Sequence, residues 1–287
     1  MESMSIKLRM PVQETMLMFF GFISRFPYLK IFLFKIIYKV WGIDENQLVY
    51  KITRINNKYL FTTEGSSLHR KVFNGITLDL DISKSTQAAI YFSKPCYENR
   101  NVKFIKKFLR KDMVFIDAGA HIGYYSLLAA KLVGDKGKVI AFEPEPYNYK
   151  GFKHNVSLNN FTNIDTYEIG LSDVTKGKKL YVNSYNDGGH TLECADKEFN
   201  VFCIDVKAFA LDCFLKETYA NLCVNFVKID VEKHTSSVLE GMQNTLAYFR
   251  PHILVEHNGR IQLIKNFLRR LGYSEFVNTG FDLFCTK

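Results

Sequence analysis

The sequence predicts an α/β protein built on a doubly wound, mostly parallel sheet of seven strands. Three observations predict it. From about residue 112 onward, short apolar runs alternate with amphipathic helical patterns, the runs are hydrophobic on both faces, and the last two runs have no helix between them. Runs of this kind are typical of parallel strands that are covered by helices on both sides. The last two suit an antiparallel hairpin that closes one edge of the sheet.

The strands and helices can be placed along the chain in order. The predicted strands are VFIDAG, KVIAFEP, NIDTYEIG, VNFVKIDV, HILVEH, SEFVNTG and FDLFCTK. Helical patterns follow most of them, at residues 124–132, 147–158, 238–249 and 261–271. A further amphipathic helix is expected upstream, over residues 98–110. Ser237 and Glu240 have the spacing of a capping box that opens the helix after the fourth strand.

The N-terminal part, residues 1–46, predicts a basic, apolar helical extension. Its core, residues 16–41, is the most apolar stretch of the chain, but Arg25 and Pro27 interrupt it before it reaches the about 20 residues that a spanning helix needs. We expect helices packed on the catalytic domain, and the alternative is peripheral contact with an anionic membrane. No small-residue cleavage site follows, so we expect a cytoplasmic protein, peripheral at the inner face of the membrane if the alternative holds.

A small β-rich cap and a linking helix are predicted for residues 47–111. Short alternating runs such as KYLFTTEG and NGITLDLD are separated there by Asn-Asn and Asn-Gly, which are turn signals. The remaining residues, 112–287, would then form the cofactor-binding domain with the seven-stranded sheet.

The composition excludes few functions. A net charge of +9 would suit an acidic partner, but a surface kept solvated by lysines explains it as well, and we expect no nucleic acid partner. The six cysteines include no CxxC pair and no neighbouring histidine at metal spacing, which argues against a zinc site. Most are flanked by apolar residues, as buried reduced thiols of a cytoplasmic protein would be.

The first strand of the sheet runs through a glycine turn into a helix, in FIDAGAHIGYYS. A dinucleotide fingerprint aligned on Gly123 would need glycine where Ala118 and Ala120 stand, so that match fails. Asp117 places a carboxylate beside the helix N-terminus, where a pyrophosphate needs positive potential. An ammonium and a sulfonium would suit this carboxylate, and S-adenosylmethionine carries both. Gly119 and Gly123 would let the backbone approach such a ligand closely.

The next two strand ends add further candidates. Glu143 lies where an acidic residue can bind both hydroxyls of a ribose, which supports a nucleoside without identifying it. Ser172 and Asp173 are placed to meet an adenine edge, and a turn with a capping side chain would account for them equally simply. The candidate cofactor-binding residues are Asp117, Gly119, Ala120, His121, Gly123, Glu143, Ser172 and Asp173.

An ordered series of segments resembles the FkbM-type family of S-adenosylmethionine-dependent methyltransferases: VFIDAGAHIGYYSLLAA, KVIAFEPEP, HNVSLNN, IGLSD, DGGH, VKIDVE, VLEGM and RPHILVEH. The resemblance covers the chain from about residue 76 and implies the class I methyltransferase fold and O-methylation of hydroxyls on sugars and natural products. It implies cofactor binding by Asp117, Gly119, Gly123 and Glu143, and a meeting of methyl group and acceptor at Asp230 and Glu232. This sequence departs from the family pattern at Lys233, in place of glycine, and at Thr235, in place of glutamate.

The segment DVEKH follows the fourth strand and supplies the candidate catalytic residues Asp230, Glu232 and His234. A carboxylate or imidazole at a strand end can position an acceptor hydroxyl and take its proton. Candidate substrate-binding residues come from other loops, including DGGH, which is read either as a lid or as a plain hairpin turn: Glu98, Asp187, His190, Glu256 and His257. Carboxylates at this edge suit a divalent cation, but no spacing fixes its geometry, and we predict no metal.

Taken together, these residues predict an S-adenosylmethionine-dependent O-methyltransferase acting on a hydroxyl of a sugar, glycolipid or small natural product. A non-catalytic binding module with the same fold is the first alternative, since Lys233 and Thr235 alter the catalytic segment. A nicotinamide-dependent oxidoreductase is the second, and the broken fingerprint and Asp117 oppose it.

Overall fold

The computed structural model of the chain places five stretches of residues: 68–82, 84–183, 186–193, 201–219 and 222–287. These residues fall into two compact units. Leu80–Tyr97 belongs to one unit, and Arg70–Asp79 together with Glu98–Lys287 belongs to the other. The division therefore runs through the region expected to form the β-rich cap. The predicted N-terminal helical extension lies outside the described residues.

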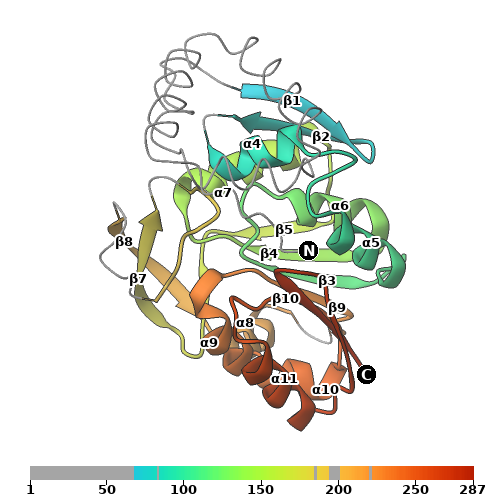
Figure 1. The fold of residues 1–287 in the computed structure, drawn as a ribbon, viewed down its shortest axis with the longest axis vertical. Coiled ribbons are helices and arrows are strands. Elements are labelled where there is room, and N and C mark those ends of the chain that lie inside the picture. Colours follow the sequence, from blue (N-terminus) through green and yellow to red (C-terminus); the bar gives the residue numbers. More distant parts are fainter. Residues whose placement is uncertain (1–67, 83, 184–185, 194–200, 220–221) are drawn as a thin grey trace, which may run out of the picture. The chain divides into compact units, whose positions relative to one another are not determined.

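The larger unit is built on a seven-stranded sheet with the order β11-β12-β10-β9-β3-β4-β5 (Figure 1). The five strands from β10 to β5 are parallel, and β12 is antiparallel to both of its neighbours. The strands are β3 (Val114–Ala118), β4 (Lys138–Phe142), β5 (Ile164–Tyr167), β9 (Phe226–Ile229), β10 (His252–Glu256), β11 (Glu275–Asn278) and β12 (Asp282–Thr286). The predicted doubly wound sheet with an antiparallel hairpin at one edge is confirmed.

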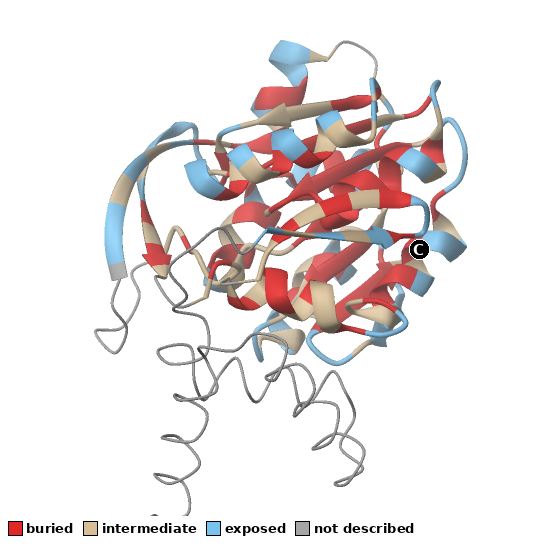
Figure 2. Ribbon diagram, turned by 90° about the horizontal axis from the view of Figure 1, so that it is seen from above, coloured by how far each residue is buried: buried red, intermediate tan, exposed pale blue. Residues whose placement is uncertain are grey.

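The centre of the sheet forms the hydrophobic core of this unit (Figure 2). Every residue of β3 and of β9 is buried, because both strands carry apolar side chains on both faces. Two charged residues interrupt this pattern, Asp117 in β3 and Lys228 in β9, and they are register partners on adjacent strands. Their burial is the first sign that the carboxyl end of the sheet has a role beyond packing.

The helices lie close to their predicted positions. The structure has α5 (Asn99–Phe108), α6 (Tyr124–Val133), α7 (Pro146–Leu158) and α11 (Ile261–Arg270). The helix expected at 238–249 is wrong as a single element, because the structure has α9 (Thr235–Gly241) and α10 (Gln243–Phe249) with Met242 between them. The predicted capping box is also wrong, since α9 begins two residues before Ser237 and Ser237 lies inside it.

A smaller three-stranded sheet was not predicted. It has the order β6-β8-β7 and is formed by β6 (Gly170–Leu171), β7 (Lys176–Asn183) and β8 (Val201–Phe209), and α8 (Leu211–Thr218) follows it. The sequence of β7, KGKKLYVN, is rich in lysine and does not have the pattern of a buried strand, because only Leu180 and Val182 are buried.

The described part of the expected β-rich cap is a hairpin of β1 (Leu68–Phe73) and β2 (Ile76–Asp81). Its turn is Asn74-Gly75, and both residues have positive φ, 50° and 70°, as a tight two-residue hairpin turn requires. The other unit contains α4 (Ser85–Phe92), and within that unit Gln87 accepts a hydrogen bond from the backbone of Asp81 at 2.8 Å.

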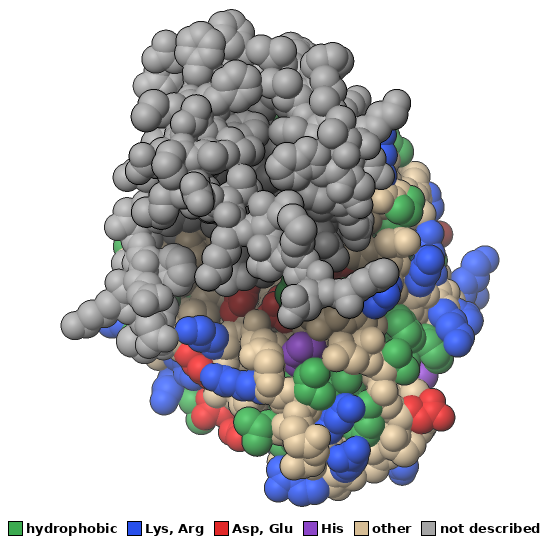
Figure 3. Space-filling view, viewed as in Figure 1, with side chains coloured by type: hydrophobic (Ala, Val, Ile, Leu, Met, Phe, Trp, Pro, Cys, Tyr) green, Lys and Arg blue, Asp and Glu red, His purple; other side chains and the backbone are tan. Residues whose placement is uncertain are grey.

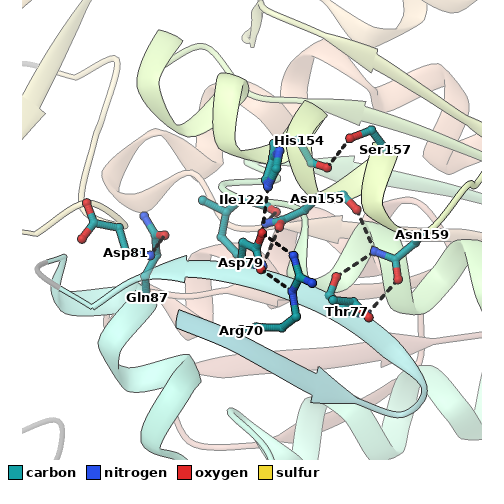
Figure 4. A network of polar contacts seen from close by, with 10 residues as sticks. All are labelled: Arg70, Thr77, Asp79, Asp81, Gln87, Ile122, His154, Asn155, Ser157 and Asn159. Carbon is teal, nitrogen blue, oxygen red and sulfur yellow. Dashed lines mark hydrogen bonds and ion pairs between the residues drawn. The ribbon is translucent and has the colours of Figure 1, made fainter. Parts of the chain in front are cut away.

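A polar network joins β2 to α7 (Figure 4). Arg70 binds both oxygens of Asp79, at 2.8 and 3.0 Å, and His154 contacts the same carboxylate at 3.0 Å. Asn155 is fully buried; its Oδ1 accepts a hydrogen bond from the Asp79 backbone at 2.9 Å, and its Nδ2 donates to the carbonyl of Ile122 at 3.0 Å. Because Ile122 belongs to the glycine turn after β3, Asn155 ties that turn to the hairpin.

The described surface can be compared with the charge and the cysteine pattern of the sequence. On the face seen in Figure 3, Lys and Arg side chains are dispersed among polar and hydrophobic ones. No helix within the described ranges is long and apolar enough to cross a bilayer. The expected burial of the cysteines is confirmed for Cys96 and Cys285 and wrong for Cys203, Cys213 and Cys223, which are exposed. Short apolar flanks did not distinguish a surface position from a core position.

Candidate active site

The glycine turn and the DVEKH segment meet at the carboxyl ends of two adjacent central strands. The backbone N–H of Asp230 donates to the carbonyl of Ala118 at 2.9 Å. Gly119 has φ +83°, and a Cβ atom built on it would lie 1.8 Å from the Asp230 carbonyl oxygen. Only glycine fits this close approach of two backbones. The predicted cofactor loop and the predicted catalytic segment are therefore in direct contact, where a doubly wound sheet places its ligand.

Asp117 lies beneath this contact and is completely buried. The Ser126 hydroxyl donates to its Oδ2 at 2.6 Å, while Oδ1 has no hydrogen-bond partner among the described residues. Burial raises the pKa of Asp117 to about 6, although Lys228 works in the opposite direction. A buried carboxylate oxygen without a donor is costly, so this oxygen is ready to accept a bond from a cationic ligand.

Glu143 closes the other side of the glycine turn. Its carboxylate accepts the backbone N–H of His121 at 2.7 Å and that of Glu145 at 3.0 Å. Burial raises the pKa of Glu143 to about 7, and His121 opposes this shift. Each carboxylate oxygen can accept a second hydrogen bond, so Glu143 can hold the turn and still receive two ribose hydroxyls.

The DGGH loop is tied to the glycine turn through Asp187. Its Oδ2 lies 2.8 Å from Nε2 of His121, and Asn148 donates to its carbonyl at 2.8 Å. Burial disfavours the charged imidazole, but Asp187 outweighs it and raises the pKa of His121. His190 instead accepts the backbone N–H of Asn183 at 3.0 Å, within the loop itself. The structure thus brings Asp187 to the predicted cofactor residue His121.

Four carboxylates form a row at the same edge of the sheet, and we call Asp230, Glu232, Glu256 and Asp282 the acidic row. Asp230 follows β9, Glu256 ends β10, and Asp282 begins β12, so they come from three adjacent strands. Glu256 and Asp282 are direct cross-strand partners. The Thr235 hydroxyl lies 3.1 Å from the carbonyl of Glu232 and 3.3 Å from that of Glu256, which keeps these two residues side by side.

The members of the row disturb one another. Burial, followed by the charge of Asp230, raises the pKa of Glu232 to about 7 and that of Glu256 further. Burial and Glu98 raise the pKa of Asp282 to about 7. Glu232 also has φ +56°, a left-handed conformation that costs free energy in a residue with a side chain. Strain and a pKa near neutrality thus coincide at Glu232.

Glu98 joins the row from α5. It accepts hydrogen bonds from the Tyr125 hydroxyl and from Asn101, and Asn101 also donates to Asp282 at 2.7 Å. His257 lies at the end of β10 and is occupied differently, because its ring contacts the Gly280 carbonyl at 2.8 Å and the Gly259 N–H at 3.1 Å. The structure therefore brings Glu98 to the acidic row and ties His257 to the loops around it.

His234 lies in a different environment from the two carboxylates that precede it. The turn at Glu232–His234 reverses the chain, so the His234 ring is buried 3.0 Å from the Ser172 hydroxyl and 3.4 Å from the Lys178 ammonium. Burial, assisted by Lys178, lowers the pKa of His234 to about 4. Ser172 in turn donates to Asp173 at 2.6 Å. His234, Ser172 and Asp173 thus form a separate cluster beside the three-stranded sheet.

The charge of the site decides which ligand suits it. The carboxyl groups of Asp117, Glu143 and Asp187 lie at the glycine turn, where they disfavour a pyrophosphate and favour an ammonium and a sulfonium. The residues therefore fit S-adenosylmethionine. Asp117 and Glu143 would be its polar partners, and the glycine turn would let the cofactor lie close to the protein backbone. Across the described ranges, no three His, Cys, Asp or Glu side chains are arranged to hold a metal ion.

Two contributors were missed at the sequence level. Asp282 was read only as part of the last strand, although a carboxylate opposite Glu256 needed knowledge of the strand register. Lys228 carried a visible signal, because it is the one charged side chain within the apolar run VNFVKI. A lysine in a strand buried on both faces requires a charged partner.

Comparison with known proteins identifies the family of the chain. Residues 117–275, more than half of the chain, match the family model for the methyltransferase FkbM domain. Methyltransferase 1 of Beauveria bassiana (strain ARSEF 2860) is 25% identical over 185 residues, which cover 58% of this chain and 74% of that protein. Methyltransferase sdnD of Sordaria araneosa is 27% identical over 193 residues, covering 56% and 71%. The crystal structure of methyltransferase FkbM from Methylobacillus flagellatus KT is 14% identical, with a TM-score of 0.44 over 65% of this chain and 50% of that one.

Proposed function

Since the chain belongs to the FkbM methyltransferase family and is an S-adenosylmethionine-dependent methyltransferase, we propose that its acceptor is a hydroxyl of a sugar, glycolipid or small natural product. The observation that carries the proposal is the contact between Gly119 and Asp230, because it sets carboxylates able to accept a hydroxyl proton directly beside the cofactor loop. When bound, S-adenosylmethionine supplies an electrophilic methyl group on a sulfonium.

We propose that Asp117 and Glu143 hold the cofactor, because their carboxylates can still accept hydrogen bonds. Asp117 offers Oδ1 to the ammonium, and Glu143 offers its remaining lone pairs to the ribose hydroxyls. The link from His121 to Asp187 holds the DGGH loop at the glycine turn, and we propose that the loop limits the access of water there. Low access of water strengthens each of these charge-assisted bonds.

We assign the role of general base to Glu232. It is partly exposed, its pKa of about 7 suits proton transfer near neutral pH, and its strained backbone holds it at the edge of the row. The proton of the acceptor hydroxyl moves to the Glu232 carboxylate as the oxygen gains its methyl group. Asp230 is engaged with Lys228 and orients the acceptor, while His234 is buried in its own cluster and supports the turn.

The two departures from the family pattern leave this arrangement intact. Lys233 has an exposed side chain, and its carbonyl accepts a hydrogen bond from Arg260 at 3.1 Å. Thr235 does not cap α9, as its side chain could have done, but contacts the carbonyls of Glu232 and Glu256 instead. The Thr235 side chain thus holds the catalytic turn in place and Lys233 keeps the backbone contact with Arg260, which supports an active enzyme over a binding module that has only kept the fold.

The test is transfer of labelled methyl from S-adenosylmethionine to a panel of hydroxylated acceptors, namely monosaccharides, glycolipid headgroups and polyhydroxylated small molecules. Wild type should methylate at least one class. Glu232→Gln should lose at least about a hundredfold in turnover with unchanged cofactor affinity, the usual scale for loss of a general base. Glu240→Gln is the matched control, since Glu240 is an exposed residue of α9.

Two outcomes would contradict the proposal separately. If wild type binds the cofactor and methylates no hydroxyl acceptor, the acceptor class is wrong. If it methylates a hydroxyl and Glu232→Gln is as fast as Glu240→Gln, the acceptor class stands and Glu232 is not the base.

A further inference from the structure

Lys228 is a buried lysine at the centre of the sheet. Its side chain is 3% exposed, and its Nζ donates to Asp230 Oδ2 at 2.9 Å. The same Nζ lies 4.9 Å from the centroid of the Tyr125 ring. Taking an ammonium out of water is expensive, and a hydrophobic residue would pack at this position at far lower cost. The packing of a buried strand therefore does not account for Lys228.

We propose that Lys228 is a positioning residue of the methyl transfer, which fixes the carboxylate of Asp230 and supplies a buried positive charge to the acidic row. This inference rests on the function proposed above and assigns a role in the same site to a residue outside the candidate sets. Lys228 acts through its neighbours and is not placed in contact with cofactor or acceptor.

Polar or charged groups face Lys228 from its own strand, from β3 and from α6, and an apolar residue faces it from β10. Asp230 follows it on its own strand, and Asp117 is its register partner on β3. The ring of Tyr125 in α6 lies beneath the ammonium, and the Tyr125 hydroxyl donates a hydrogen bond to Glu98. On β10 the register partner is the apolar Leu254. Burial disfavours the ammonium, but Asp230 and Asp117 outweigh it and raise the pKa of Lys228, so it stays charged throughout the working pH range.

This single charge balances several carboxylates. It lowers the pKa of Asp117, of Glu232 and of Asp282, against burial and mutual repulsion that raise all three. Glu232 is the decisive case, because Asp230 raises its pKa while Lys233 and Lys228 lower it. Loss of Lys228 should therefore raise the pKa of Glu232 further.

Geometry gives the second half of the role. Asp230 is partly exposed, with 34% of its side chain accessible, and the bond to Lys228 fixes one of its two oxygens. Because a carboxylate is planar, fixing one oxygen also restricts the position of the other, which can then orient an acceptor. A compact ammonium above an aromatic ring suits this task, whereas the broad, planar guanidinium of arginine would keep the charge and change the direction of the bond.

The test compares three substitutions. Lys228→Met removes the charge, and Lys228→Arg keeps the charge and alters the geometry. Lys138→Met is the matched control, because Lys138 also pairs with an aspartate on the sheet, Asp165 at 2.7 Å, but lies at the first residue of β4. The first readout needs no acceptor: carbon NMR titration of glutamate carboxylates in the cofactor-free protein, with the Glu232 signal assigned by its loss in Glu232→Gln.

Lys228→Met should raise the Glu232 titration midpoint by at least about one pH unit, and Lys228→Arg and Lys138→Met should leave it close to wild type. The acid limb of the pH–rate profile should shift in the same direction, whereas a purely structural lysine would lower the rate without moving the limb. Lys228→Met should slow the Asp230→Asn variant less than it slows wild type, since Lys228 acts in large part through that carboxylate.

An unshifted midpoint in folded Lys228→Met overturns the proposal, as do losses of rate from Lys228→Met and Asp230→Asn that are fully additive in the double variant. If Lys228→Met does not fold, two variants still decide. Asp230→Asn must lower the Glu232 midpoint, and the double variant, which removes both members of the pair, must fold and restore a midpoint near wild type. Because the titration requires no methyl transfer, failure of this inference is distinguishable from failure of the hydroxyl-acceptor proposal.

Discussion

Replacing Gly119 by alanine tests the contact on which the site is built. The new Cβ would lie 1.8 Å from the Asp230 carbonyl oxygen. A carbon and an oxygen in contact normally lie about 3.3 Å apart, so the two backbones must separate by roughly 1.5 Å. The left-handed φ of +83° adds about 1–2 kcal/mol of strain for a residue with a Cβ. Gly119→Ala should therefore lower the stability of the protein and widen the gap between the cofactor loop and the catalytic segment.

The spacing is the part that affects function. Asp230 cannot simply move away, because its N–H is bonded to Ala118 and its side chain to Lys228. A displacement of about 1 Å at reacting groups can cost on the order of a hundredfold in rate. We expect Gly119→Ala to reduce turnover by at least that factor and to weaken binding of S-adenosylmethionine more than tenfold, as measured by isothermal titration calorimetry and by steady-state kinetics.

Gly134→Ala is the matched control. Gly134 follows α6 with a similar φ of +70°, but no atom lies within 4 Å of a Cβ built on it. It should lose about 1–2 kcal/mol in urea denaturation and keep cofactor affinity and turnover. If Gly119→Ala behaves like Gly134→Ala in all three measurements, the two backbones are not in the close contact described, and the link between cofactor loop and catalytic segment is refuted.

Two further predictions concern the residues around the glycine turn. Asp187→Asn should loosen the loop held on His121, so that hydrogen exchange of residues 186–193 speeds up about tenfold, while Asp173→Asn, which alters a more exposed pair with Lys178, should leave that exchange unchanged. Equal exchange in both variants would show that Asp187 does not hold the loop. Burial raises the pKa of Glu143 to about 7, above the ordinary value of 4.5, so the folded state keeps this proton more tightly than the unfolded chain. Its contribution to stability is then greatest below about pH 4.5 and falls, by roughly 3 kcal/mol, as the pH rises through 7. Urea denaturation at about pH 5 and pH 8 should show a smaller fall for Glu143→Gln than for wild type, and parallel falls would contradict the assignment.

The parallel sheet and its helices could be predicted because their signal is local. Strands such as VFIDAG and VNFVKI are apolar on both faces, and few structures apart from a covered parallel sheet produce that pattern. The three-stranded sheet could not be predicted, since β7 is mostly solvated and its lysines are typical of a loop. The break between α9 and α10 also escaped prediction, because a Cβ on Gly241 would lie 1.7 Å from the Ser172 carbonyl, a contact between segments far apart in sequence.

The same distinction holds for the site. Strand ends identified Asp117, Glu143 and Asp230, because the carboxyl ends of parallel strands share one edge. The position of His234 could not be read from DVEKH, since alternation suggests that Asp230, Glu232 and His234 face the same way. A turn at Glu232 redirects the chain, and the ring enters the cluster of Ser172 instead. Residues paired only through tertiary structure, such as Asp282 with Glu256, carry no local signal at all.

The position of β12 has a consequence for how the chain acquires its site during synthesis. This strand follows every other strand of the large sheet in sequence, yet it lies inside the sheet, between β10 and β11. A nascent chain emerging from the ribosome can therefore assemble β3, β4, β5, β9 and β10 early, but must leave the flank of β10 open until the residues after Asp282 are released. Insertion of such a late inner strand requires contacts of long sequence separation, which form slowly. The hydrogen bond from Asn101 to Asp282, between residues 181 positions apart, is then among the last to form. The partly made chain therefore holds its cofactor loop before it holds its full set of carboxylates.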